Sequence, residues 1–203
     1  MDINNYMLKT GEQAKKSSFL TASASSVQKN NFLNNLGQRI LKNVSKIISI
    51  NKKDLDQAAK DNFDDAFIDR LTLNQKNITA MADGLFQIEK LKDPIGQISN
   101  ERIMPSGIKV SQMRVSLGVI GMIYESRPNV TIDAAGLAIK SGNAIILRGG
   151  SESINSNTYL GELITQSLNE TGFSSSSIQI IETTDREAVN KLITMNEYVD
   201  VII

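Results

Sequence analysis

The chain has 203 residues, and its 22 lysines and arginines are balanced by 22 aspartates and glutamates, so the formal net charge is zero. This balance gives no reason to expect nucleic acid or an anionic membrane as a partner. Cysteine and histidine are both absent, which excludes disulfides, zinc–thiolate sites, a thiolate nucleophile within these residues and the commonest general base.

No run of about 18 apolar residues is present, so no transmembrane helix is expected. The N-terminal sequence lacks the apolar core of a signal peptide. A cytoplasmic location is therefore expected, by default rather than from a targeting signal. Apolar residues make up 40% of the chain, which is enough for a sizeable core.

Residues 1–91 are predicted to be helical. Apolar side chains recur three and four residues apart over 27–48, which predicts one amphipathic helix that Ser25 or Ser26 caps. The positions on its buried face are Leu33, Leu36, Ile40, Val44 and Ile47.

Two further helix starts are predicted in this part of the chain. Asn51 followed by Asp54 resembles the cap of a short separate helix, and a turn is expected around 66–71. Asn74 is expected to cap a later helix that ends near Leu91.

The pattern changes after Asp93-Pro94, because the residue before proline avoids the α region. Weak alternation over 98–115, with a turn at Ser106-Gly107, predicts one or two antiparallel strands. A hairpin placed before a parallel sheet can be an oligomerisation arm or merely an edge, and both interpretations stay open.

Short, continuous apolar runs then alternate with helical segments, which predicts an α/β fold with a parallel, doubly wound sheet covered on both faces. The strands are expected over 118–124, 144–148, 178–181 and 199–203, and the helices over 129–140, 152–170 and 185–194. The first of these helices is expected to bury Val130, Ala134, Leu137 and Ala138.

The chain is thus divided into three parts. Residues 1–100 form an N-terminal helical layer, 101–117 form hairpin or arm strands, and 118–203 form the βα units.

The turn from Arg148 to Glu152, with the sequence RGGSE, is the first candidate site. Glycines let a backbone approach a ligand closely, and the amides that open the following helix favour anions. Arg148 adds a forked cationic donor. These features suit a phosphate or ribose, whereas the alternative is a tight turn in which the glycines serve geometry alone. Neither a GxGxxG fingerprint nor a phosphate loop occurs, so any nucleotide site is of another kind.

The turn ESRPN, residues 125–129, should open into the same crevice from a neighbouring strand. Arg127 can hold an anionic substrate, and the amides after it can stabilise an oxyanion. The alternative is that Asn129 only caps a helix and that Arg127 only pairs with Glu125. The third turn, 183–186, can line the adenine end of a nucleotide, although a plain cap by Thr184 or Asp185 is favoured.

Two motifs, GVIGMIYESRPNVTIDAAGLAIKSGNAIILRGGSE and DREAVNKLITMNEYVDVII, closely resemble the gamma-glutamyl phosphate reductases, also called glutamate-5-semialdehyde dehydrogenases. This family belongs to the aldehyde dehydrogenase superfamily, and the resemblance covers essentially the whole chain. It implies an aldehyde-dehydrogenase-like, Rossmann-type sheet with an N-terminal helical layer. It also implies that the full-length enzyme is a homo-oligomer. The implied reaction is NADPH-dependent reduction of the small molecule gamma-glutamyl phosphate to glutamate 5-semialdehyde and phosphate, in proline biosynthesis.

The resemblance also implies roles for particular residues. The cofactor would be held by Arg148, Gly149, Gly150, Ser151, Glu152 and Thr184, and the substrate by Ser126, Arg127 and Asn129. In the superfamily a Lys-Pro-Ser-Glu type of motif holds the cofactor ribose, and here Arg148 replaces the lysine and one glycine is added. An ungapped match places Arg127, rather than Asn129, at the position of the superfamily's oxyanion-hole asparagine, so the choice between them stays open.

The family's nucleophile is a cysteine in a second, catalytic domain, and this chain contains no cysteine. The chain is therefore expected to be a part of the enzyme that lacks the nucleophile and is inactive alone. The alternative is a non-catalytic dinucleotide-binding or assembly module, a shortened or split relative of the enzyme. The reading frame downstream of Ile203 would distinguish the two.

Overall fold

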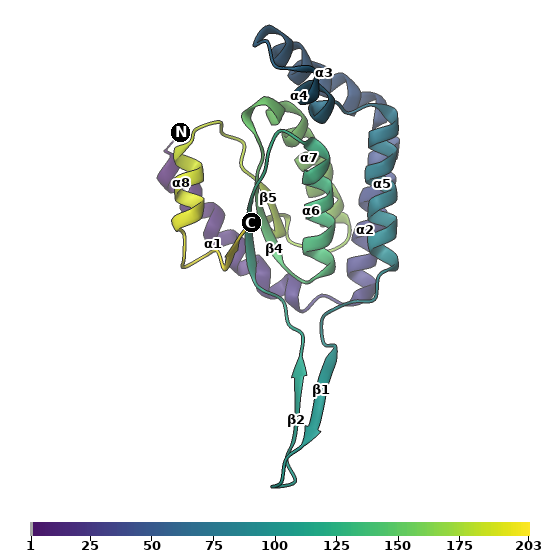
Figure 1. Cartoon of the computed structure of the whole chain (residues 1–203), viewed down its shortest axis with the longest axis vertical. Coiled ribbons are helices and arrows are strands. Elements are labelled where there is room, and N and C mark those ends of the chain that lie inside the picture. The colour runs from purple at the N-terminus through teal and green to yellow at the C-terminus, as the bar shows by residue number, and fades with distance from the viewer. Residues whose placement is uncertain (1) are drawn as a thin grey trace.

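Four parallel strands form the central sheet of the computed structural model, which describes residues 2–203 (Figure 1). In spatial order the strands are β5 (Ile178–Ile180), β4 (Ala144–Arg148), β3 (Val119–Ile123) and β6 (Val201–Ile202). The predicted α/β class with a parallel sheet is confirmed. Met1, which the helical prediction included, lies outside the described residues.

The order of the strands creates a switch point next to β3. The chain passes from β3 to β4 to β5 on one side, and then crosses back to place β6 on the other side of β3. Ile123 pairs with Arg148 at the carboxyl ends of β3 and β4, so the turns that follow these strands lie at the same edge. Sheets of this kind bind ligands at such an edge.

Helices cover both faces of the sheet. On one face a cluster of buried apolar side chains joins α1 (Ile3–Ala22) and α8 (Glu187–Thr194) to the strands. On the other face lie α6 (Pro128–Lys140) and α7 (Ile154–Glu170). All five residues of β4 are buried, as expected for a strand that is covered from both sides.

A further helical layer packs on α6 and α7 through α2 (Ser26–Lys42), α3 (Val44–Lys60) and α5 (Gln75–Lys90), and a short helix, α4 (Asp65–Leu71), follows α3. This is the predicted N-terminal helical layer, and caps by Ser25 and Asn74 are present as expected. The prediction of one helix over 27–48 is wrong, because the chain turns at Asn43.

The predicted helix start at Asn51 is also wrong. The α3 helix runs through this position without interruption, and both Asn51 and Asp54 are buried. Their side chains instead bind other elements, as described below. The predicted turn at 66–71 is the helix α4.

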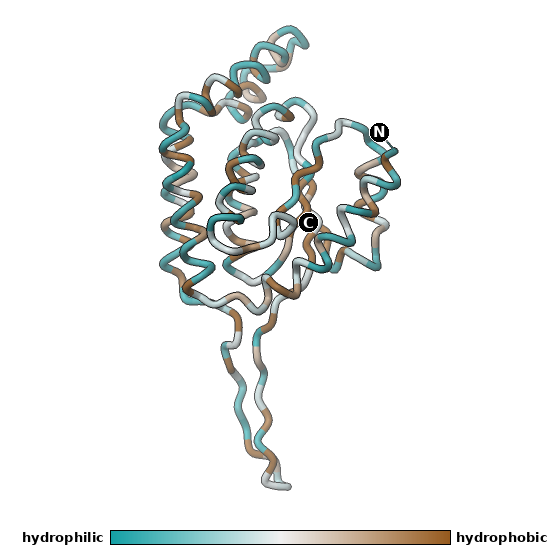
Figure 2. Tube along the Cα trace, turned by 180° about the vertical axis from the view of Figure 1, so that it is seen from behind, coloured by the Kyte–Doolittle hydropathy of each residue, from teal (hydrophilic) through white to brown (hydrophobic). Residues whose placement is uncertain are grey.

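The strands β1 (Ile98–Ile103) and β2 (Lys109–Met113) form an antiparallel hairpin that extends away from the rest of the molecule (Figure 1). All residues of both strands are exposed, and Gly107, with φ of 84°, provides the turn. Hydrophobic stretches lie along both strands of this arm (Figure 2). The exposed large hydrophobic side chains of the arm are Ile98, Ile103, Met104, Ile108, Val110 and Met113.

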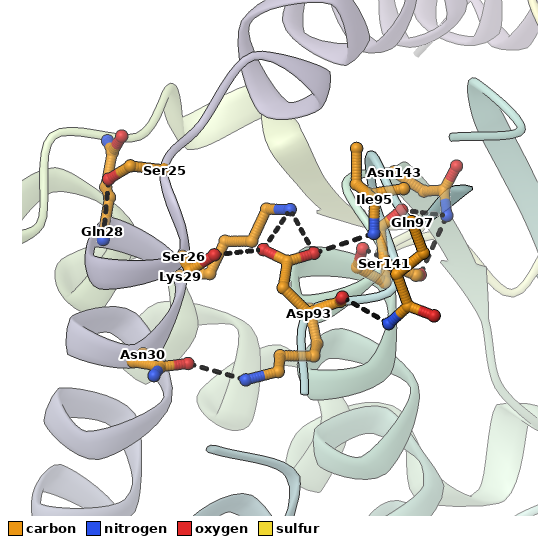
Figure 3. Close-up of polar contacts among 12 residues, drawn as sticks. Ser25, Ser26, Gln28, Lys29, Asn30, Asp93, Ile95, Gln97, Ser141 and Asn143 are labelled. Atoms are coloured by element: carbon orange, nitrogen blue, oxygen red, sulfur yellow. Dashed lines mark hydrogen bonds and ion pairs between the residues drawn. The ribbon is translucent and has the colours of Figure 1, made fainter. Parts of the chain in front are cut away.

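A polar network holds the base of the arm (Figure 3). The Asp93 carboxylate accepts hydrogen bonds from Ser26 Oγ at 2.8 Å, from Lys29 Nζ at 3.0 Å and from the Ile95 backbone N–H at 2.9 Å. Lys29 is only 1% exposed. On the returning side, Asn143 Oδ1 accepts hydrogen bonds from the backbone N–H groups of residues 117 and 118. Both connections to the arm are therefore fixed to the body.

Within residues 2–203, none of the helices combines the length and the apolar character needed to cross a membrane.

Candidate cofactor and substrate site

A short hydrogen bond joins the two turns that follow β3 and β4. Ser126 Oγ donates to Glu152 Oε2 at 2.6 Å, and Ser151 Oγ donates to the other carboxylate oxygen at 3.1 Å. Burial would raise the pKa of Glu152, but these hydrogen bonds, its own N–H and the nearby charge of Arg148 lower that pKa below its usual value. The carboxylate is therefore ionised at neutral pH, and Ser126 is buried against it.

Arg148 ends β4 and is 8% exposed. Its guanidinium donates to the carbonyl of Gly149 and, at 3.4 Å, to the carbonyl of Thr184, so it links the second turn to the third. Within residues 2–203 its Nε has no hydrogen-bond partner, and Arg148 takes part in none of the ion pairs. The nearby Glu152 carboxylate interacts with this guanidinium only at longer range, without forming an ion pair, so an anionic ligand in direct contact would be stabilising here.

The two glycines of the RGGSE turn make room for protein side chains. A Cβ on Gly150 would collide with Ser126 Oγ and lie 2.8 Å from Glu152 Oε2. A Cβ on Gly149 would collide with the amide of Asn157 and lie 3.1 Å from the ring of Tyr124. Gly150 has an ordinary φ of −55°, so close approach rather than backbone freedom requires glycine here.

The helix that follows this turn does not offer all of its first amides to a ligand. The backbone N–H groups of Asn155 and Ser156 donate to the Asp54 carboxylate, at 3.2 and 2.8 Å. The prediction of an anion site on the opening amides of this helix is therefore wrong for these two groups. Sequence reasoning did not assign Asp54 to this helix, because Asp54 lies on α3, about a hundred residues away in the chain.

A chain of hydrogen bonds stiffens the wall between the turns. The Tyr124 hydroxyl lies 2.7 Å from Thr131 Oγ1, which donates to Asn157 Oδ1 at 2.8 Å, and Asn157 Nδ2 donates to Ser153 Oγ at 2.9 Å. Burial raises the pKa of Tyr124 to about 12, so this phenol stays protonated and has a structural role. The sequence offered one indication of this network: Thr131 is a polar residue on the buried face of the predicted helix.

A cavity of about 320 Å³ lies beside the ESRPN turn, between this turn, α6 and the helices α4 and α5. Its charged and amide lining residues are Asp69, Arg70, Asn77, Arg127, Asn129 and Asp133. The cavity thus contains two of the three predicted substrate residues, whereas the third, Ser126, faces Glu152.

Asn129 is not the predicted cap, because α6 begins at Pro128 and Asn129 lies inside its first turn. Its Nδ2 donates to Asp133 Oδ2 at 3.3 Å. Arg127 Nε lies 3.6 Å from Glu125 Oε2, and both side chains are largely exposed. Such a pair is weak, so it leaves Arg127 free to bind a ligand.

In the third turn Asp185 Oδ1 accepts a hydrogen bond from the Glu187 N–H at 2.9 Å. The residue directly before α8 is Arg186, whose side chain makes no capping hydrogen bond. Of the two predicted caps, Thr184 and Asp185, Asp185 thus meets one amide at the start of the helix. Thr184 is exposed and contacts the RGGSE turn through its carbonyl and Arg148. Residues 2–203 contain no cluster of three acidic side chains that could hold a metal ion.

Solved structures share this architecture over nearly the whole chain. The gamma-glutamyl phosphate reductase of Thermotoga maritima superposes with a TM-score of 0.93 at 34% identity, covering 97% of this chain and 47% of that one. The enzyme of the same name from Saccharomyces cerevisiae gives a TM-score of 0.89 at 29% identity, covering 97% of this chain and 50% of that one. The chain matches the N-terminal part of the gamma-glutamyl phosphate reductases.

The resemblance to gamma-glutamyl phosphate reductase that the motifs indicated is thereby confirmed. The chain spans about half the length of these reductases. A probable aldehyde dehydrogenase from Listeria monocytogenes has the same fold, with a TM-score of 0.75 at 15% identity over 98% of this chain and 41% of that one. No model of a protein family matches the chain.

Proposed function

We propose that the chain forms the cofactor-binding part of an NADP-dependent gamma-glutamyl phosphate reductase, which converts L-gamma-glutamyl phosphate to L-glutamate 5-semialdehyde and phosphate in proline biosynthesis. The observation that carries this proposal is the 34% identity to the Thermotoga maritima reductase over 97% of the chain. The bound NADPH would supply the hydride. The residues of this chain would position the two ligands.

The RGGSE turn is the proposed cofactor site. The buried guanidinium of Arg148 forms no ion pair within residues 2–203 and would favour the negative charge of a dinucleotide. The ionised Glu152 offers carboxylate oxygens to ribose hydroxyls, and Ser151 and Thr184 are exposed at the rim. Gly149 and Gly150 keep the turn close to its neighbours.

The cavity beside the ESRPN turn is the proposed substrate site. Arg127 and Asn129 line this cavity and would meet the substrate, while Ser126 holds the turn against Glu152. The two sites are adjacent because one hydrogen bond joins the turns that carry them.

The covalent step needs a group from elsewhere. The chain has no cysteine, so the thiolate that attacks the acyl phosphate would come from outside these 203 residues. We expect this chain alone to have no reductase activity.

The exposed hairpin, which lies in the sequence between the helical part and the βα units, would serve as an oligomerisation arm.

NADPH titration of the purified chain tests the proposal. We expect weak binding that Arg148→Ala reduces about tenfold, because the variant loses charge-assisted hydrogen bonds. Arg148→Lys keeps the charge, so its affinity for NADPH should lie between those of the wild type and Arg148→Ala. Arg102→Ala on the arm is the matched control and should leave the affinity unchanged. If the affinity of folded Arg148→Ala equals that of the wild type, Arg148 is not part of the site. Oxidation of NADPH on addition of gamma-glutamyl phosphate would refute the expectation that this chain lacks the nucleophile.

A further inference from the structure

The cavity beside the ESRPN turn carries charges of both signs. Arg70 and Asp69 reach it from α4, Arg127 from the turn, and Asp133 from α6. Its volume of about 320 Å³ is at the small end of the range for sites that hold small molecules. Cations and N–H donors favour a phosphate, whereas the two carboxylates on this wall, Asp69 and Asp133, would repel one.

Asp133 has no cationic partner in the part of the chain that the structure describes. It is partly buried, and within residues 2–203 it takes part in none of the ion pairs. Burial raises the pKa of this carboxyl group even though Asn129 donates a hydrogen bond to it. A carboxylate in such a setting is stabilised when a cationic ligand arrives.

Arg70 and Arg127 are cations of the cavity that lack a strong anionic partner within residues 2–203. Arg70 is exposed near the end of α4 and is a member of none of the ion pairs among residues 2–203. The 3.6 Å contact of Arg127 with Glu125 is exposed and weak. Both arginines line the cavity, and a forked guanidinium group is suited to a carboxylate.

We propose that this cavity binds the amino-acid head of the substrate, with Asp133 pairing with the α-ammonium group and Arg70 and Arg127 pairing with the α-carboxylate. The inference rests on the proposed function for the identity of the substrate. A zwitterionic head requires both signs of charge at close quarters, and the lining provides them. The acyl phosphate at the other end of the substrate then remains free to react. Arg70 and Asp133 become specificity-determining residues.

Binding of L-glutamate and glutarate to the full chain, followed by calorimetry or NMR, tests this assignment. Glutarate lacks the α-ammonium group but keeps both carboxylates. Asp133→Asn should weaken L-glutamate binding about tenfold, since a charged hydrogen bond is lost, and should leave glutarate binding unchanged or stronger. Arg70→Gln should weaken both ligands. Asp83→Asn and Lys76→Gln, on exposed positions of α5, are controls that should change neither.

The outcomes separate cleanly. If Asp133→Asn weakens both ligands alike, Asp133 has a merely structural role and the inference falls. Absence of L-glutamate binding to the wild-type chain also overturns it. Asp133→Glu keeps the charge and should retain more L-glutamate binding than Asp133→Asn, which guards against a folding defect. NADPH binding without L-glutamate binding refutes this inference alone. L-glutamate binding without NADPH binding refutes the proposed cofactor role and leaves the amino-acid site supported.

Discussion

The buried carboxylate of Asp54 accepts two hydrogen bonds from Ser156, from its backbone N–H at 2.8 Å and from its Oγ at 2.6 Å. Asn155 adds its backbone N–H and its side-chain amide to the same carboxylate. A residue of α3 therefore caps the first turn of α7, immediately after the candidate cofactor turn. A carboxylate at the start of a helix also interacts favourably with the helix dipole.

Replacing Asp54 by alanine should strongly destabilise the protein. The buried amides would lose a charged acceptor, and we expect the free energy of unfolding to fall by about 3 kcal/mol. Urea denaturation followed by circular dichroism measures the loss. The control is Asp56→Ala on the same helix, whose exposed pair with Lys52 should contribute less than about 0.5 kcal/mol. Equal losses in the two variants would contradict the capping role.

Sequence reasoning found the right residue types here but assigned them to the wrong helix. Asn51 and Asp54 were predicted to open a helix, because their side chains commonly cap helices. Asp54 does cap a helix, but this helix is α7, and Asn51 holds the segment between α4 and α5 through the Leu73 N–H at 2.8 Å. Local sequence indicates that a side chain can cap, whereas the tertiary fold decides which amides it meets.

Substitution of Gly150 and Gly84 by alanine should have opposite effects. At Gly150 the new Cβ would collide with Ser126 Oγ and lie 3.0 Å from the Ser126 backbone nitrogen, so we expect a loss of about 1–3 kcal/mol. At Gly84, inside α5, the nearest atom would be Asp133 Oδ1 at an ordinary 3.7 Å, so we expect a gain of about 0.5–1 kcal/mol. Thermal and urea unfolding measure both. A tolerated Gly150→Ala would refute the close packing of the two turns.

The strands were the most predictable part of the fold. The run over 144–148 was predicted with the bounds that β4 has, since a strand buried on both faces is apolar throughout. Leu137 shows the limit of this reasoning. It was predicted to be buried on α6, but it is 52% exposed and lines an apolar groove with Ile120 and Met122. A helical stripe indicates which side chains favour burial, and only the packing of neighbours shows which are covered.

The charged cavity was beyond the reach of sequence reasoning for a related reason. The ESRPN turn was singled out, and Arg127 and Asn129 do line the cavity. Arg70 and Asp133 lie on helices whose relative position depends on how α4 and α5 pack against α6. Their side chains carry no local pattern that would mark them as partners.

The arm should be weakly protected against hydrogen exchange. A two-stranded hairpin without a covering layer is marginally stable in water, and all residues of β1 and β2 are exposed. In dilute solution we expect its amides to exchange about 100-fold or more faster than those of β4. Mass spectrometry of deuterium uptake measures this, with β4 as the internal reference. Protection that rises with concentration only in the arm would support pairing with a second copy. Equal protection of β4 and the arm in dilute monomer would contradict the expectation.

The ion pair between Lys29 and Asp93 should make stability depend on pH. Burial opposes the charged form of Asp93, but hydrogen bonds from the Ile95 N–H, from Ser26 and from Lys29 outweigh it, so its pKa lies below the ordinary 3.8 (Figure 3). A pKa lowered by folding means that the stabilisation is present above 3.8 and is lost as the pH falls through the folded-state pKa.

Asp93→Asn should lower the free energy of unfolding at neutral pH by about 3 kcal/mol, because Lys29, which is 1% exposed, would keep a buried charge without a partner. The difference between wild type and variant should shrink below pH 3.8, since the wild-type carboxyl group is then protonated. Urea unfolding between about pH 7 and about pH 3 measures the difference. Asp83→Asn, an exposed change of equal charge, should show no such trend. A wild-type advantage that stays constant over this range would show that hydrogen bonding, rather than the charge of Asp93, holds the base of the arm.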